Sequence, residues 1–302
     1  MLTIGRNLGM NSKILIIGAS GFLGRALVKE ILSKTTNPRL LYRTERIDDR
    51  VAITSMAPHL NHQTTMEEFF AEGDCNFEII NCASVRYPRA DNDSQRGNFD
   101  TPKMILENAI SRSNQVIKWI QPESFWQYTQ DRTPDPEYVQ WKNNFGLVLE
   151  EFSHMSKIQY QKVVLPHLFG VNDDMNRFFP KLFKKLLNQA TVNISGGGDI
   201  FAIADVADVS SYFVQLLAEN AFQFRNNLVI FPSHEITLRD LVGEFISDSS
   251  SQPTIIWEKT STATNPTMNL ARDFIGRRLD LTLTPIERSV SNIRSWLTQN
   301  VD

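Results

Sequence analysis

Cysteine is scarce in this chain, with only Cys75 and Cys82 among 302 residues. Two cysteines are too few for a disulfide framework or a cysteine-rich metal site, so we expect no metal and a reducing, cytoplasmic setting. No apolar run is long enough to cross a membrane. Residues 1–12 lack the apolar core of a signal peptide, and we expect them to form an N-terminal tail.

A strong excess of one charge is also absent. The chain has 31 basic and 34 acidic residues, a net charge of −3. Nucleic acids and acidic membrane surfaces are recognised through clustered positive charge, so this balance argues against both as partners. A length of 302 residues allows about two domains, or one domain with an appended lobe. We therefore expect a small-molecule site.

Glycine is not abundant, yet three glycines stand close together after an apolar run. Ile14–Ile17 reads as a buried parallel strand, and Gly18, Gly21 and Gly24 follow it at G-x-x-G-x-x-G spacing. Leu23, Ala26, Leu27 and Ile31 then recur at helical spacing. Strand, glycine turn and helix open a dinucleotide-binding βαβ unit, in which a pyrophosphate lies at the helix N-terminus.

The next expected strand, residues 39–43, ends where such enzymes read the ribose of the cofactor. NAD enzymes usually carry an acidic residue there, for the ribose 2′-hydroxyl. This chain has Arg43, with Arg46 close behind. A cation can neutralise a 2′-phosphate, so we expect NADP rather than NAD. The alternative is that Arg43 is an ordinary solvated residue at a strand end.

Further elements alternate between strands and helices. Expected strands are 50–54, 77–81, 116–120 and 163–165. Expected helices are 65–71, capped by Thr64 or Thr65; 98–109, opened by Asn98; 138–152; 178–187; 206–218; 237–245, capped by Thr237; and the last, with a capping box at Thr284–Glu287. This order predicts an α/β fold with a Rossmann-type, doubly wound parallel sheet.

Tyr138 and Lys142 are four residues apart on an expected helix, so they share one face. Ser124 follows the strand expected before that helix. Taken alone, a Tyr and Lys pair of this spacing is common by chance. Thr129 and Ser111 are alternatives to Ser124.

These motifs together resemble the extended short-chain dehydrogenase/reductases of the NAD-dependent epimerase/dehydratase family. The resemblance covers nearly the whole chain. It includes the three glycines, Asn81–Ser84, Asn98, Ser124, Tyr138 with Lys142, His167–Gly170 and Asp205–Asp208. Glu123–Trp126 and the short loop that follows are most similar to the nucleotide-sugar 4-ketoreductases, the group that includes the CDP-abequose synthases.

The resemblance implies a catalytic set of Ser124, Tyr138 and Lys142. A phenol holds its proton up to about pH 10, and an adjacent ammonium stabilises the tyrosinate, so Lys142 would let Tyr138 exchange a proton. Ser124 would hydrogen-bond the substrate carbonyl. The implied cofactor-binding residues are Gly18, Ser20, Gly21, Phe22, Leu23, Gly24, Arg43, Ala83, Ser84, Asn98, Tyr138, Lys142 and Leu165. The implied substrate-binding residues are Ser124, His167, Arg177 and Phe178.

The implied function is NADPH-dependent reduction of a 4-keto-6-deoxy nucleotide sugar for surface-polysaccharide synthesis. A nucleotide-sugar epimerase or dehydratase is the alternative, although Phe125 and Trp126 stand where dehydratases carry an Asp-Glu pair. A non-catalytic NADP(H)-binding sensor is a second alternative. Phe201 occupies the position of a family arginine that binds the substrate diphosphate. Arg177, Lys181, Lys184 and Lys185 could supply the missing charge; the alternative is a substrate that carries no diphosphate.

The sequence thus predicts a nucleotide-binding domain at 13–169, with a return segment at 201–224. It predicts a smaller C-terminal substrate lobe from residues 170–200 and 225–302. A homodimer through the helix that carries Tyr138 is left open, because Phe145, Leu149 and Phe152 could face either a second subunit or the sheet.

Overall fold

The computed structural model describes residues 12–34, 41–47, 50–56, 63–71, 76–86, 92–112, 117–129, 135–155, 158–218, 228–247, 252–258 and 277–300. The predicted tail up to residue 11, Cys75, the Arg46 side chain and parts of the predicted lobe lie outside them. The chain forms two compact units. The first is 1–127, 132–164 and 210–229, and the second is 128–131, 165–209 and 230–302.

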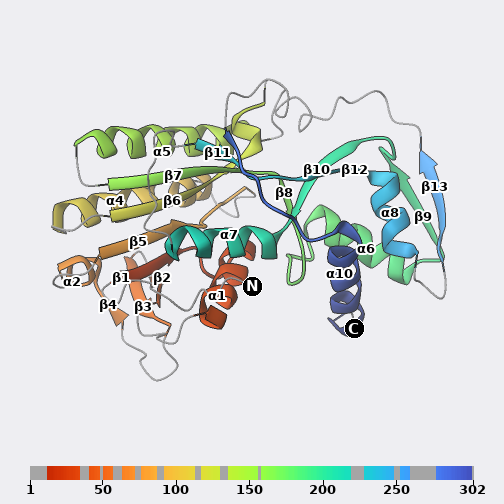
Figure 1. Ribbon diagram of the computed structural model, residues 1–302, viewed down its shortest axis with the longest axis horizontal. Coiled ribbons are helices and arrows are strands. Elements are labelled where there is room, and N and C mark those ends of the chain that lie inside the picture. Colours follow the sequence, from red (N-terminus) through yellow and green to blue (C-terminus); the bar gives the residue numbers. More distant parts are fainter. Residues whose placement is uncertain are drawn as a thin grey trace. The chain divides into compact units, whose positions relative to one another are not determined.

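The first unit is built on a large, mostly parallel sheet (Figure 1). Its strands are β1 (Ser12–Ile17), β2 (Leu41–Ile47), β3 (Arg50–Ser55), β4 (Gln63–Thr64), β5 (Asn76–Asn81), β6 (Ile117–Ser124), β7 (Ile158–Leu165) and β11 (Leu228–Ile230). With the short strand β14 (Arg277–Arg278) at the β11 edge, the order in the sheet is β14-β11-β7-β6-β5-β1-β2-β3-β4. β1 pairs in parallel with β2 and β5, and β5 pairs in parallel with β6. The predicted α/β, Rossmann-type fold is confirmed.

Helices cover both faces of this sheet (Figure 1). They are α1 (Phe22–Lys34), α2 (Met66–Ala71), α3 (Asp93–Gln95), the π-helical turn η2 (Arg96–Asp100), α4 (Thr101–Arg112), the 3-10 turn η3 (Phe125–Gln127), α5 (Pro136–Met155) and α7 (Val206–Ala218). α2, α4 and α5 share one core with the strands, including Trp119 and Phe145. α1 and α7 lie side by side, where the Lys34 ammonium donates to Ser211 Oγ at 3.3 Å.

Two details of this unit differ from the sequence prediction. The strand at residues 50–55 is antiparallel to β2, with Tyr42 opposite Ser55, so one edge of the sheet is antiparallel. Asn98 does not open a helix, because the helical segment already begins at Asp93 and Asn98 lies in the π-helical turn.

Phe145 and Leu149 are fully buried in the core and therefore face the sheet.

The described part of the second unit contains two small sheets and the helices α6 (Phe178–Asn188), α8 (Leu238–Ile246) and α10 (Ile286–Asn300). Its small sheets are formed by β8 (His167–Phe169), β9 (Thr191–Ser195), β10 (Ile200–Asp205), β12 (His234–Thr237) and β13 (Thr254–Glu258). The sheet orders are β12-β10-β8 and β13-β9. Apolar faces of α6, α8 and α10 form the core, where Phe183 and Phe245 stack with ring centroids 4.2 Å apart.

The hydrogen bonds at the helix N-termini can be compared with the predicted caps. Thr65 and Glu68 form a reciprocal capping box, and Thr237 accepts from the Asp240 N–H, so both predicted caps are confirmed. The capping box predicted at Thr284 is wrong. The Thr284 N–H and hydroxyl donate instead to the Asp208 carboxylate at 2.9 and 2.7 Å, a distant partner that the sequence pattern does not reveal.

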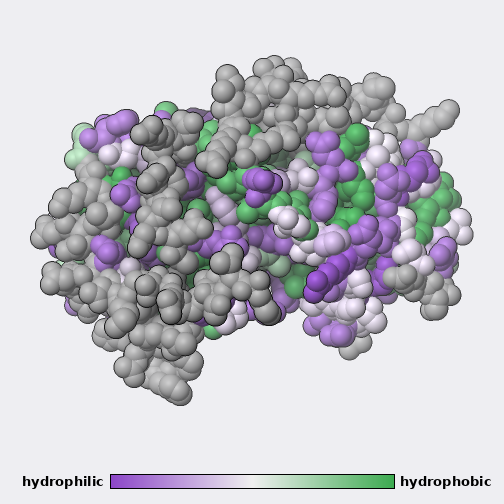
Figure 2. Space-filling view, viewed as in Figure 1, coloured by the Kyte–Doolittle hydropathy of each residue, from purple (hydrophilic) through white to green (hydrophobic). Residues whose placement is uncertain are grey.

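The described helices include none long and apolar enough to cross a membrane. The face shown in Figure 2 mixes hydrophilic and hydrophobic residues wherever the placed residues are visible.

The turn between β1 and α1 is closely packed against its own backbone. Gly18 has a φ of +75°, which glycine adopts without strain. A Cβ at Gly24 would stand 2.2 Å from the Gly18 carbonyl oxygen, so only glycine lets α1 approach β1 this closely. A Cβ at Gly21 would meet only that same oxygen, at 3.3 Å. Gly24 is therefore needed for packing, and Gly21 is not.

We predict that Gly24→Ala lowers the free energy of unfolding by more than about 2 kcal/mol, because backbone atoms must move apart. Gly243→Ala is the matched control, since a Cβ at this α8 position meets nothing within 4 Å. It should stabilise the protein by up to about 1 kcal/mol through helix propensity alone. Denaturant unfolding measures both, and a Gly24→Ala variant as stable as the wild type would contradict the packing argument.

Candidate active site

The site of the first unit lies where β1 and β5 end. After β1, the chain adds β2 on one side of it and later β5 on the other side. The strand order therefore reverses between β1 and β5, although these strands are parallel. Ligands of open α/β sheets bind outside the strand ends at this kind of reversal. The turn at Gly18 touches the loop after β5, since a Cβ at Gly18 would stand 2.7 Å from the Ala83 nitrogen.

The residues present fit a dinucleotide. The lack of a side chain at Gly21 suits close approach of a pyrophosphate to the backbone, and the first turn of α1 follows at once. Gly18, Ser20, Gly21, Phe22, Leu23 and Gly24 lie in this turn, as the sequence predicts.

Asn98 holds the neighbouring loop. Its side-chain oxygen accepts from the Val85 N–H at 3.1 Å, and its amide donates to the Val85 and Ser94 carbonyls at 2.8 Å each. Its polar atoms are thus used inside the protein. Asn98 therefore positions the loop that follows Ala83 and Ser84, through its hydrogen bonds to Val85.

Tyr138 and Lys142 lie on the first turns of α5. Asp135 caps this helix, accepting from the Tyr138 N–H at 3.0 Å, and Pro136 takes the first helical position. The Ser84 hydroxyl donates to the Tyr138 hydroxyl oxygen at 3.2 Å. The Lys142 ammonium lies 5.8 Å from the centre of the Tyr138 ring and donates to the Pro122 carbonyl at 3.1 Å. The structure therefore brings Ser84, Tyr138 and Lys142 together.

Ser124 is the last residue of β6 and is half-buried. Its N–H donates to the Gln127 side-chain oxygen at 2.7 Å, and its hydroxyl accepts from the Trp126 N–H at 3.4 Å. Of the alternatives, Ser111 lies in the last turn of α4 and donates to the Asn108 carbonyl. Thr129 belongs to the second unit. Ser124 is thus the hydroxyl at the strand end beside α5.

A buried acid next to this site was missed by the sequence analysis. Glu123 is 2% exposed, and its carboxylate contacts the Gln127 side chain. Burial raises the pKa of this carboxyl, while Lys142 and Lys162 act in the opposite direction. Its signal in the sequence was an acid at the end of an otherwise buried strand.

Arg43 is placed at the cofactor end of β2 but is not a free cation. It forms an ion pair with Glu45, whose other oxygen accepts from Thr54 at 2.9 Å. A carboxylate therefore lies beside the cation that the sequence analysis assigned to the 2′-phosphate. Residues 43 and 45 are two apart on one strand and so share a face, which the sequence analysis overlooked.

The second unit holds the other predicted substrate residues. The rings of His167, Phe178 and Phe201 gather in one aromatic cluster: Phe178 stacks on Phe201 at 5.9 Å, and His167 lies 5.6 Å from Phe201. Phe178 is 52% exposed. Leu165, predicted at the cofactor, is buried at the end of β7 and also falls in this unit.

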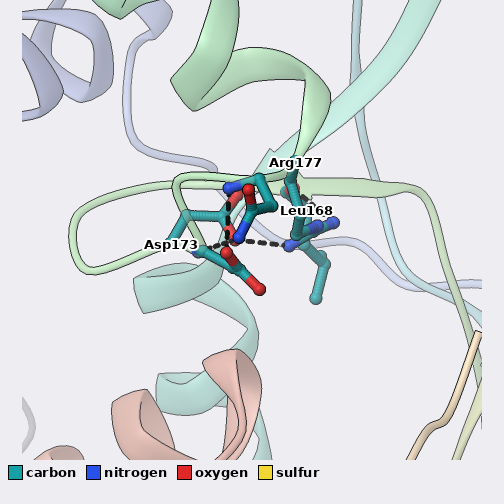
Figure 3. A network of polar contacts seen from close by, with 5 residues as sticks. Leu168, Asp173 and Arg177 are labelled. Carbon is teal, nitrogen blue, oxygen red and sulfur yellow. Dashed lines mark hydrogen bonds and ion pairs between the residues drawn. The ribbon is translucent and has the colours of Figure 1, made fainter. Parts of the chain in front are cut away.

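Arg177 is used inside the second unit (Figure 3). Its guanidinium donates to the Asp173 carboxylate at 2.7 Å and to the Leu168 carbonyl at 3.3 Å. Burial raises the pKa of Asp173, while the charge of Arg177 opposes that rise. Arg177 thus fixes the loop between β8 and α6. Because its guanidinium already donates to these two partners, fewer of its N–H groups remain to bind a substrate.

Cys82 tests the electrostatics of the loop after β5. Burial raises the pKa of its thiol to about 12, although the Lys142 charge opposes this. Only the thiolate reacts with alkylating reagents. In a Cys75→Ser background, we therefore predict that native Cys82 is alkylated at pH 8 about 10³-fold more slowly than after unfolding. Equal rates measured by mass spectrometry would contradict this environment.

Comparison with known proteins places the chain. The model of the NAD dependent epimerase/dehydratase family matches residues 14–229. No curated protein matches the sequence significantly. Solved structures share the fold at low sequence identity. One is TunA, an NAD-dependent NDP-hexosamine 5,6-dehydratase of tunicamycin biosynthesis, with 17% identity, a TM-score of 0.66, and 96% of this chain and 98% of that chain covered.

Two further structures agree in fold. UDP-glucuronic acid 4-epimerase from Bacillus cereus, in complex with UDP-glucuronic acid and NAD, has 14% identity and a TM-score of 0.66, covering 95% of this chain and 99% of that chain. DesIV, a dTDP-glucose 4,6-dehydratase from Streptomyces venezuelae with NAD and TYD bound, has 14% identity and a TM-score of 0.63, covering 95% and 97%. With the family model matching most of its length, the chain is an enzyme of the NAD dependent epimerase/dehydratase family.

Proposed function

We propose that this enzyme reduces the 4-keto group of a 6-deoxy nucleotide sugar, in the synthesis of surface-polysaccharide sugars. The observation that carries the proposal is the contact of the Tyr138 hydroxyl with Ser84, one helical turn from Lys142. Reduction of a ketone needs a proton for the oxygen that becomes an alkoxide, and Tyr138 is placed to give it.

Each residue has a stated part in this reaction. A nicotinamide cofactor, when bound along the Gly18–Gly24 turn, supplies the hydride. Tyr138 gives its hydroxyl proton to the substrate oxygen, and the Lys142 ammonium stabilises the tyrosinate that remains. The Ser124 hydroxyl donates a hydrogen bond to the same oxygen and stabilises its developing negative charge.

A nucleotide-sugar 4-epimerase or dehydratase is the second candidate. The solved structures support it, since the B. cereus epimerase and DesIV are both in complex with NAD. Against the dehydratase, Ser124 is followed by Phe125 and Trp126, which cannot serve as the acid and base of a water elimination. An epimerase would return the cofactor to its starting oxidation state, so net consumption of reduced cofactor separates it from a reductase.

We predict that Tyr138→Phe lowers kcat by about 10²–10⁴-fold while dinucleotide affinity changes little, because the phenyl ring keeps its place and loses only the proton. Tyr212→Phe, the same change on α7, is the control and should retain full rate. Steady-state kinetics and calorimetric binding measure both. A non-catalytic sensor predicts no turnover by the wild type, and an unimpaired Tyr138→Phe enzyme would remove Tyr138 from the reaction.

The choice of cofactor follows from the Arg43–Glu45 pair. The Glu45 carboxylate offsets the charge that would meet a 2′-phosphate, so we propose that the enzyme uses NAD(H) at least as well as NADP(H). This departs from the preference for NADP that Arg43 alone suggests.

We predict that Glu45→Gln releases Arg43 and tightens NADPH binding by about 10-fold, since a charge-assisted hydrogen bond is worth roughly 1.5–3 kcal/mol. NADH binding should change little. Arg43→Ala is the paired variant and should abolish the gain when combined with Glu45→Gln. Fluorescence titration of the wild type and each variant with NADH and with NADPH measures these affinities. Equal changes for NADH and NADPH would show that neither side chain reads the 2′ position.

A further inference from the structure

The hydroxyl of Tyr138 has one hydrogen-bond partner among the described residues, the hydroxyl of Ser84. Ser84 donates to the Tyr138 oxygen at 3.2 Å. The hydroxyl hydrogen of Tyr138 is therefore not used in this contact and remains available to a substrate oxygen. Tyr138 is 6% exposed, whereas Ser84 is exposed. The Ser84 hydroxyl thus lies between a buried phenol and the solvent.

A residue that gives a proton in each turnover must regain one before the next turnover. Lys142 is poorly placed to return it. Its ammonium donates to the Pro122 carbonyl at 3.1 Å and lies 5.8 Å from the centre of the Tyr138 ring. The Ser84 hydroxyl, at 3.2 Å, is within reach for direct proton transfer to the Tyr138 oxygen.

The backbone is fixed on both sides of Ser84. Before it, the Gly18 turn packs directly on the loop, since a Cβ at Gly18 would stand 2.7 Å from the Ala83 nitrogen. After it, the Asn98 side chain accepts from the Val85 N–H at 3.1 Å and donates to the Val85 carbonyl at 2.8 Å. These contacts hold the Ser84 hydroxyl in one place before any ligand binds, which favours transfer over a short distance.

The π-helical turn η2 supplies two of the residues that hold this loop. Asn98 provides the hydrogen bonds to Val85, and a Cβ at Gly97 would stand 2.4 Å from Val85 Cγ2. Glycine at position 97 therefore lets η2 approach the loop closely. π-Helical turns inside helices are frequent at functional sites. In this chain the turn supports the segment that carries Ser84.

We propose that Ser84 returns the proton to Tyr138 and is a second proton-transfer residue of the reaction. The inference rests on the proposed role of Tyr138 as the proton donor. After Tyr138 has given its proton to the substrate oxygen, the Ser84 O–H bond breaks as an O–H bond forms on the tyrosinate oxygen. The Ser84 oxygen takes a proton from water in the same step. One proton passes from solvent to Tyr138, which matches the proton that reduction of a ketone consumes.

The first test measures how fast the Tyr138 hydroxyl hydrogen exchanges with solvent, in the full chain without substrate or cofactor. NMR of tyrosine labelled with ¹³C at Cζ shows whether the hydroxyl carries hydrogen or deuterium, and Tyr138→Phe identifies the resonance. Ser84→Val and Ser84→Thr have the same shape, but only threonine keeps a hydroxyl. We predict that exchange is about 10-fold slower in Ser84→Val than in Ser84→Thr. Tyr160 on β7, which is 5% exposed, is the internal control and should exchange equally in both.

The second test uses turnover to separate proton transfer from cofactor binding, the role that the sequence predicts for Ser84. We predict that kcat of Ser84→Val is about 10²-fold below that of Ser84→Thr, with a similar KM for the cofactor. The solvent deuterium isotope effect on kcat should be larger in Ser84→Val, because return of the proton then limits the rate. A higher KM with an unchanged kcat would assign Ser84 to the cofactor alone and overturn the proposal.

The exchange measurement also decides against a structural role. Equal rates in the two variants, or faster exchange in Ser84→Val, would overturn the inference, because a structural Ser84 shields the Tyr138 hydroxyl and does not carry its proton. If Ser84→Val does not fold, Ser84→Ala takes its place in the comparison. Exchange needs no turnover. Slower exchange in an enzyme that reduces no 4-keto sugar would therefore refute the proposed function and leave the proton path standing.

Discussion

The hydrogen bond from the Lys142 ammonium to the Pro122 carbonyl ties the proposed catalytic helix to the sheet. That carbonyl also accepts from the Gln121 amide, whose own oxygen accepts from Asn81 at the end of β5. One chain of hydrogen bonds therefore runs from β5 through β6 to α5. Tyr138 lies one turn before Lys142 on α5. These hydrogen bonds therefore also fix the position at which the Tyr138 hydroxyl meets Ser84.

Burial of ionisable groups at this site lowers the stability of the fold. An acid, Glu123, and two lysines are buried beside α5, where each charge loses the solvation of water. Apolar packing on the same helix offsets this cost, since Phe145 and Leu149 are fully buried against the sheet. Charges that reduce stability and yet sit beside a reactive group are expected at functional sites, which conserve activity at the expense of stability.

Local patterns in the sequence were sufficient for the fold and for part of the site. The glycine spacing predicted the β1 turn because Gly18 and Gly24 meet short-range requirements of the backbone, and the spacing of Tyr138 and Lys142 predicted a shared helix face. Long-range contacts were not predictable in this way. Glu45 meeting Arg43, Asp208 capturing Thr284, and Gly146 making room for Glu123 all depend on which elements become neighbours in space. The antiparallel pairing of β3 with β2 was unpredictable for the same reason, because the pattern of apolar residues in a strand does not reveal whether it runs parallel or antiparallel to its neighbour.

In the proposed reaction, a hydride passes from the cofactor to a sugar ketone while Tyr138 supplies the proton. The most direct measurement is NMR of the product formed from a 4-keto-6-deoxy nucleotide sugar and reduced nicotinamide dinucleotide carrying deuterium at the transferable position. The account predicts one deuterium at C4 of the product sugar for each cofactor oxidised. A converted sugar that carries no deuterium at C4, with the cofactor pool unchanged, would contradict it.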